Sequence, residues 1–135
     1  MKEITLEATV ENILVVTDFV NEELDRINCS EKVKAEIDIA IDELFGNIAN
    51  YAYKDETGMA CVQLEINNNP CKVIITFIDN GVEYNPLTKA DPNITLSAKD
   101  RAIGGLGVYI VKNTMDEIEY EYKDGSNILR IEKNI

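Results

Sequence analysis

The stretch Gly104–Val111, with the sequence GGLGVYIV, places three glycines within four positions directly before an apolar run. The chain has only 7 glycines, and glycine is unfavourable inside a helix, so this clustering needs a physical reason. The apolar run predicts a helix over residues 105–115, with the glycines at its N-terminus. Unpaired backbone N–H groups there bind anions, and glycine lets a phosphate approach them. A glycine-rich turn that only packs closely is the alternative.

The elements around this helix follow from periodicity and turn signals. A strand over 2–10 precedes helices over 11–27 and 31–52, with Ser30 as the N-cap of the second. Strands over 60–66 and 72–78 form one hairpin, and strands over 117–123 and 127–133 form another. Residues 79–104 are rich in turn signals, which is typical of a lid or binding loop. This order predicts an α/β (α+β) two-layer sandwich, with a mostly antiparallel mixed sheet and helices on one face.

Composition excludes several classes of function. The net charge of −12 disfavours nucleic acid and anionic membranes as partners. The absence of histidine excludes Ser-His-Asp and Cys-His catalysis, histidine-ligated zinc and phosphorylation of a histidine within the chain. The 3 cysteines form no C-x-x-C pair and indicate free thiols in a reducing compartment. With no apolar stretch of about 20 residues, a single cytoplasmic domain is expected.

A second segment with chemical potential lies in the helix over 31–52. Its apolar stripe is predicted to consist of Val33, Ile37, Ile41, Leu44, Ile48 and Tyr51. Glu43 and Asn47 are four residues apart and share a face beside this stripe. A carboxylate and a carboxamide at the edge of a core suit a general base and a Mg²⁺ ligand. An exposed polar face is the alternative.

A third segment, Asp79-Asn80-Gly81, ends the apolar strand VIITFID. Asn-Gly is a strong turn signal, so a simple hairpin turn is the alternative here, although the residues that follow do not resemble a returning strand. An aspartate at a strand end can accept a hydrogen bond from an exocyclic amine such as N6 of adenine. Guanine presents an acceptor at that position, and two acceptors repel each other.

Together, in this order, the three segments resemble the nucleotide-binding boxes of the GHKL ATPase superfamily. Glu43-x-x-x-Asn47 resembles the N box, Asp79-x-Gly81 the G1 box and Gly105-x-Gly107 the G2 box. Over nearly its whole length the chain is most similar to the anti-sigma-factor serine/threonine kinases of the RsbW and SpoIIAB type. The resemblance implies a Bergerat ATP-binding fold and a single histidine-kinase-like ATPase domain over residues 1–135.

The resemblance also implies roles for individual residues. Glu43 would be the general base, Asn47 would coordinate Mg²⁺, and Asp79 would bind adenine with Gly81 allowing close approach. The nucleotide phosphates would be bound by residues of the lid and the following helix, namely Arg101, Gly104, Gly105, Leu106 and Gly107. Tyr51 departs from the family, because many relatives carry a histidine at this position.

The implied function is that of an ATP-dependent serine/threonine protein kinase and anti-sigma factor. Such a protein phosphorylates a STAS-domain anti-anti-sigma protein, sequesters a sigma factor and is often a homodimer. A module of a different class is the alternative: it would bind ATP without catalysis and act by sequestering a sigma factor or another partner. Glu43 separates the two, since a pure binding module needs no carboxylate beside Asn47.

Overall fold

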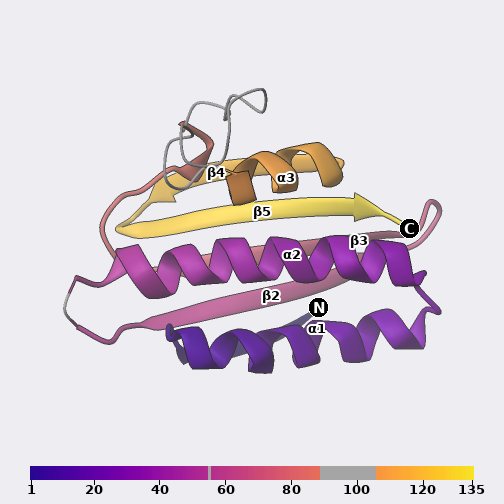
Figure 1. Ribbon diagram of the computed structural model, residues 1–135, viewed down its shortest axis with the longest axis horizontal. Coiled ribbons are helices and arrows are strands. Elements are labelled where there is room, and N and C mark those ends of the chain that lie inside the picture. Colours follow the sequence, from indigo (N-terminus) through magenta and orange to yellow (C-terminus); the bar gives the residue numbers. More distant parts are fainter. Residues whose placement is uncertain (55, 89–105) are drawn as a thin grey trace.

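The computed structural model describes residues 1–54, 56–88 and 106–135, which form an antiparallel sheet covered on one face by helices (Figure 1). The strands are β1 (Lys2–Glu7), β2 (Met59–Asn67), β3 (Lys72–Asp79), β4 (Glu117–Lys123) and β5 (Ser126–Asn134). Their order across the sheet is β1-β2-β3-β5-β4. The predicted two-layer sandwich is confirmed, and each strand pair among the described residues is antiparallel, so the sheet is not mixed.

Three helices cover the sheet: α1 (Ile13–Arg26), α2 (Glu31–Asn47) and α3 (Leu106–Thr114). Figure 1 shows α2 between α1 and α3, where it contacts both. Ser30 caps α2 as predicted, because its hydroxyl oxygen accepts a hydrogen bond from the backbone N–H of Val33 at 3.2 Å. Within the described ranges, no helix combines the length and apolarity needed to cross a bilayer.

The core lies between α2 and the inner face of the central strands. Alternate residues of β3 point inward, and Phe77 and Ile75 are each about 1% exposed. They lie opposite Leu129 and Ile131 of β5 in the antiparallel register. The next inward pair along these strands is Asp79 and Asn127, both buried. The apolar core therefore ends in a polar cross-strand pair, and this end of the sheet carries the candidate site.

Both predicted hairpins are confirmed. β4 and β5 are joined by Asp124 and Gly125, whose φ angles of 53° and 80° are typical of a type I′ turn. The first strand is shorter than predicted: it ends at Glu7, and the 3-10 turn η1 (Val10–Asn12) separates it from α1.

The helix predicted over 31–52 ends earlier as an α-helix than its periodicity indicated. α2 stops at Asn47, and the chain continues as a π-helical turn, η2 (Ile48–Ala52). A π-turn advances fewer degrees per residue than an α-helix, so the apolar stripe rotates out of register. Tyr51, predicted to belong to the buried stripe, is instead 53% exposed.

Candidate functional site

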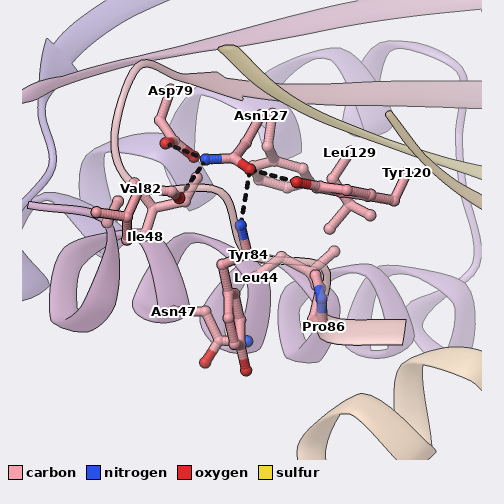
Figure 2. A pocket seen from close by; sticks show the side chains of 12 residues that line it. Leu44, Asn47, Ile48, Asp79, Val82, Tyr84, Pro86, Tyr120, Asn127 and Leu129 are labelled. Atoms are coloured by element: carbon pink, nitrogen blue, oxygen red, sulfur yellow. Dashed lines mark hydrogen bonds between the residues drawn. The ribbon is translucent and has the colours of Figure 1, made fainter. Parts of the chain in front are cut away.

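A small cavity, hereafter the inner cavity, opens where α2 and η2 face the ends of β3, β4 and β5 (Figure 2). Its volume is about 30 Å³, room for about one water molecule and too little for a nucleobase. Its lining is largely apolar, with polar atoms from a few side chains. The residues are Leu44, Asn47, Ile48, Ala52, Phe77, Asp79, Val82, Tyr84, Pro86, Tyr120, Asn127 and Leu129.

Asp79 contributes a buried carboxylate to this cavity. It is the last residue of β3 and is 5% exposed. Its Oδ1 accepts hydrogen bonds from the backbone N–H of Gly81 at 2.8 Å and from Nδ2 of Asn127 at 2.9 Å. Both donors bind the same oxygen, so they hold the carboxylate in a fixed orientation.

Gly81 holds the turn after β3 against the end of η2. The backbone N–H of Val82 donates to the carbonyl oxygen of Ala52 at 2.9 Å. A Cβ at Gly81 would collide with that same carbonyl group, so only glycine allows this close approach. The predicted role of Gly81, close approach to a base, stays a prediction, but its contact with η2 is a structural requirement of the chain itself.

Asn127 is a site residue that the sequence did not reveal. Its Nδ2 donates to Asp79 and, at 2.8 Å, to the carbonyl oxygen of Val82. Its Oδ1 accepts from the backbone N–H of Tyr84 at 3.0 Å and from the hydroxyl of Tyr120. Both N–H bonds and both acceptor positions of the carboxamide are thus occupied (Figure 2). Asn127 lies 48 residues from Asp79, and no local motif signals it; only the strand register does.

Tyr120 supports this network from β4. Burial raises the pKa of its phenol, so the group stays protonated and able to donate to Asn127 well above neutral pH.

Glu43 and Asn47 lie on α2 as predicted, both partly buried. Nδ2 of Asn47 is 3.5 Å from Oε1 of Glu43, at the upper limit of a hydrogen bond. Asn47 lines the inner cavity and also a second, open depression of about 350 Å³, hereafter the outer hollow. The outer hollow is also lined by Glu43. Asn47 therefore lies between the inner cavity and the carboxylate of Glu43.

Gly107, at the second position of α3, is packed against Glu43. A Cβ at Gly107 would collide with the carboxylate of Glu43. The structure thus brings the predicted N box and the predicted glycine-rich helix start together, although 64 sequence positions separate them (107 − 43). Leu106 begins the described part of α3 and is 43% exposed. Arg101, Gly104 and Gly105 lie outside the described residues.

Tyr51 closes one side of the outer hollow and stands near Tyr84, their ring centroids 6.1 Å apart. Tyr84 lines the inner cavity, so the two rings span the boundary between the two depressions. Tyr51 is thus one half of an aromatic contact at the edge of the outer hollow.

The donor set of this site suits Mg²⁺ held mainly by substrate phosphates. In the described ranges, no three side chains of His, Cys, Asp or Glu gather into a cluster that would hold a metal by itself. The amide of Asn47 and the carboxylate of Glu43 offer hard oxygen atoms beside the hollow, and Mg²⁺ commonly takes one or two protein ligands plus phosphate and water.

Comparisons with known proteins show which family the chain resembles. The family model described as a histidine kinase-like ATPase domain matches residues 6–133. A serine-protein kinase RsbW of Bacillus cereus (strain AH820) is 30% identical over 95 residues, which cover 67% of this chain and 58% of that protein. A serine/threonine-protein kinase BtrW of Bordetella bronchiseptica is 26% identical over 102 residues, or 76% of this chain and 71% of that protein. The match thus spans less than two thirds of the RsbW sequence.

The fold is shared with a solved structure. The crystal structure of the RsbU and RsbW domains of Rv1364c from Mycobacterium tuberculosis superposes with a TM-score of 0.61 at 16% identity. The alignment covers 99% of this chain and 32% of that chain. At this identity the likeness concerns the backbone arrangement alone.

Proposed function

Because the chain belongs to the histidine kinase-like ATPase domain family, we propose that it binds Mg·ATP and transfers the γ-phosphoryl group to a serine or threonine of a partner protein. The observation that carries this proposal is the continuity of the site. Asp79 lies at one end, Asn47 in the middle, and Glu43 with Gly107 at the other. The adenine ring, the phosphates of ATP and the hydroxyl group of the acceptor protein would lie along the site in this same order.

In this proposal each residue has one task. The Asp79 carboxylate accepts a hydrogen bond from the adenine amine, and Gly81 keeps its backbone close to the base. Asn47 supplies an oxygen to Mg²⁺, which would offset phosphate charge. Backbone and side-chain donors for the phosphates come from Arg101, Gly104, Gly105, Leu106 and Gly107.

Glu43 acts as the general base. Glu43 accepts the proton of the acceptor hydroxyl as that hydroxyl oxygen forms a bond to the γ-phosphorus. The bond between the γ-phosphorus and the β,γ-bridging oxygen breaks, and ADP leaves. Phosphoryl transfer asks little more of a protein than positioning and charge stabilisation. A carboxylate held beside Asn47 and Gly107 is suited to that task.

The inner cavity must widen for this function, because about 30 Å³ cannot hold adenine. Its floor is built from core residues of α2 and β3, whereas Val82 and Tyr84 belong to the turn-rich segment after β3. We propose that the base enters as the side chains of Val82 and Tyr84 move aside, while the backbone of both residues keeps its hydrogen bonds to Asn127; Val82 is 46% exposed.

We further propose that the biological acceptor is a STAS-domain anti-anti-sigma protein and that the chain is an anti-sigma factor. A sigma factor would be its second partner, and a cytoplasmic homodimer its working form. The names of the curated relatives support the kinase part of this proposal, and the resemblance of the three boxes supports the rest.

The test is Glu43→Gln, assayed for nucleotide binding by thermal shift and for transfer of labelled γ-phosphate to a STAS-domain protein from the same genome. The variant should bind Mg·ATP like the wild type and lose at least about a hundredfold in transfer, since general-base catalysis contributes about 10²–10⁴. Glu31→Gln, the same change at an exposed position of α2, should leave both properties unchanged.

Transfer by Glu43→Gln at the wild-type rate would refute the assignment of the base. Binding of Mg·ATP by the wild type without transfer to any acceptor would favour the non-catalytic regulatory module. Binding of no nucleotide would refute the proposal as a whole.

A further inference from the structure

We infer that Asn127 is a positioning residue that fixes the carboxylate of Asp79 as a hydrogen-bond acceptor and thereby sets the preference of the site for adenine over guanine. The inference rests on the proposed nucleotide binding and goes beyond it, because it concerns a residue outside all three boxes. Asn127 acts through Asp79 and need not contact the ligand.

The first step of the argument is the use of the two carboxylate oxygens. Oδ1 of Asp79 accepts from Gly81 and Asn127, at 2.8 and 2.9 Å. Within the described part of the chain, Oδ2 has no hydrogen-bond partner. Because Asp79 lines the inner cavity, Oδ2 is the oxygen left for a ligand. Two donors on one oxygen hold the carboxylate plane in a fixed orientation.

The second step is the orientation of the Asn127 carboxamide, which its backbone partners determine without ambiguity. The carbonyl oxygen of Val82 can only accept, and the N–H of Tyr84 can only donate. The amide must therefore present Nδ2 toward Val82 and Oδ1 toward Tyr84. This same orientation directs the remaining N–H to Asp79 and leaves Oδ1 to accept from Tyr120 (Figure 2).

The third step is the chemistry of discrimination. An ionised carboxylate accepts from the exocyclic amine of adenine and repels the exocyclic oxygen of guanine. A carboxylate that can rotate no longer presents an acceptor at a fixed place, and the preference for adenine over guanine weakens. The N–H of Asn127 opposes this rotation, because its hydrogen bond of 2.9 Å holds Oδ1 in place and leaves Oδ2 for the ligand.

The test compares Asn127→Ala, Asn127→Asp and the control Asn134→Ala, which makes the same truncation at an exposed position of β5. Dissociation constants for Mg·ATP and Mg·GTP are measured by calorimetry at pH 8.0 and 5.5. The wild type and Asn134→Ala should prefer ATP to a similar degree. Asn127→Ala should lose about tenfold or more in ATP affinity and less in GTP affinity. The ratio of the dissociation constant for GTP to that for ATP should therefore fall.

Asn127→Asp gives a pH signature that a purely structural role would not produce. Its new carboxyl group would face Asp79 at the distance of the present hydrogen bond, so the two groups would have to share a proton. Its ATP affinity should therefore rise as the pH falls from 8.0 to 5.5, by more than any change in the wild type. The melting temperature of each variant is measured without nucleotide to establish folding.

The outcomes separate the inference from the function on which it rests. Equal losses for ATP and GTP in Asn127→Ala would overturn the inference while leaving nucleotide binding intact. If Asn127→Ala does not fold, the pH profile of Asn127→Asp decides, and a profile parallel to that of the wild type overturns it. Failure of the wild type to bind either nucleotide refutes the proposed function itself.

Discussion

Two glycines of this site exclude a side chain for different reasons. At Gly81 the obstacle is the backbone carbonyl of Ala52, which cannot move without disturbing η2. At Gly107 the obstacle is the carboxylate of Glu43, the far end of a flexible side chain. A substitution at Gly81 therefore strains the fold, whereas a substitution at Gly107 displaces the carboxylate that we propose as the general base. The same residue type serves stability in one place and positioning in the other.

Gly107→Ala should reduce phosphoryl transfer by about a hundredfold, because a displacement of roughly 1 Å at a reacting group has that effect. Its melting temperature should stay close to that of the wild type, since alanine favours helix and Glu43 can rotate away. Gly81→Ala is the matched comparison and should lose about 1–3 kcal/mol of unfolding free energy through overpacking. Thermal denaturation measures the stability of both variants, and single-turnover assays measure their phosphoryl transfer. Normal transfer by Gly107→Ala would contradict the assigned contact.

At the scale of elements, α2 carries most of the candidate site. It contacts α1 and α3, bears Glu43 and Asn47, and continues into η2, which contacts the turn after β3. Gly46 of α2 faces Ile13 of α1, and a Cβ at Gly46 would lie 3.8 Å from Cδ1 of Ile13, an ordinary van der Waals distance. The position of this one helix therefore sets the distance between the inner cavity and the carboxylate of Glu43.

The N-cap of α2 is accordingly a test of stability without a change in the site. Ser30→Ala removes the acceptor for the N–H of Val33 and should lower the free energy of unfolding by about 0.5–2 kcal/mol. Ser30→Asp keeps an acceptor at the same place and should retain most of the stability. Urea denaturation gives both values. A loss in Ser30→Asp as large as that in Ser30→Ala would show that the hydroxyl does not act as a cap.

At the scale of the whole molecule, a strongly negative chain carries a candidate site in which a buried carboxylate is contacted by backbone and amide donors. The net charge is −12, yet Asp79 is bound by an N–H of the backbone and an amide of Asn127 rather than by a cation. On the sheet face that the helices leave open, Glu132 is buried and paired with Arg130 and, at 3.7 Å, with Lys72. Buried carboxylates are thus stabilised by local hydrogen bonds and ion pairs, even though the net charge of the chain is strongly negative.

The titration of buried groups predicts how the stability of the whole molecule depends on pH. Burial raises the pKa of the Tyr53 and Tyr120 phenols from 10.0, and burial raises the pKa of the Cys29 thiol from 9.0. The unfolded chain therefore loses these protons at lower pH than the folded chain. The stabilisation is complete below the unfolded values and is lost as the pH rises through the folded ones.

The free energy of unfolding, measured in urea, should accordingly fall between pH 8 and pH 11. Tyr53→Phe removes one titrating group and should show a shallower fall. Its stability at pH 8 should be lower than that of the wild type, because Tyr53 donates to the carbonyl of Met59 and accepts from the N–H of Asn80. Parallel curves for the two proteins would exclude Tyr53 as a source of the alkaline loss.

The sequence by itself determined the features that depend on near neighbours in the chain. The order of helices and strands, the two hairpins and the cap at Ser30 follow from periodicity and turn chemistry, which act over a few residues. The placement of Glu43 and Asn47 on one face follows from helical spacing in the same way. The functional roles of these residues, and of Asp79, stay predictions.

Only the tertiary structure decided what depends on register and on helix continuity. The exposed position of Tyr51 results from the π-turn, which shifts the periodicity on which the sequence prediction relied. The contact of Gly107 with Glu43 and the hydrogen bonds of Asn127 to Asp79 join segments far apart in the chain. Such contacts are selected by the packing of the whole core, and a single sequence without that packing contains no local signal for them.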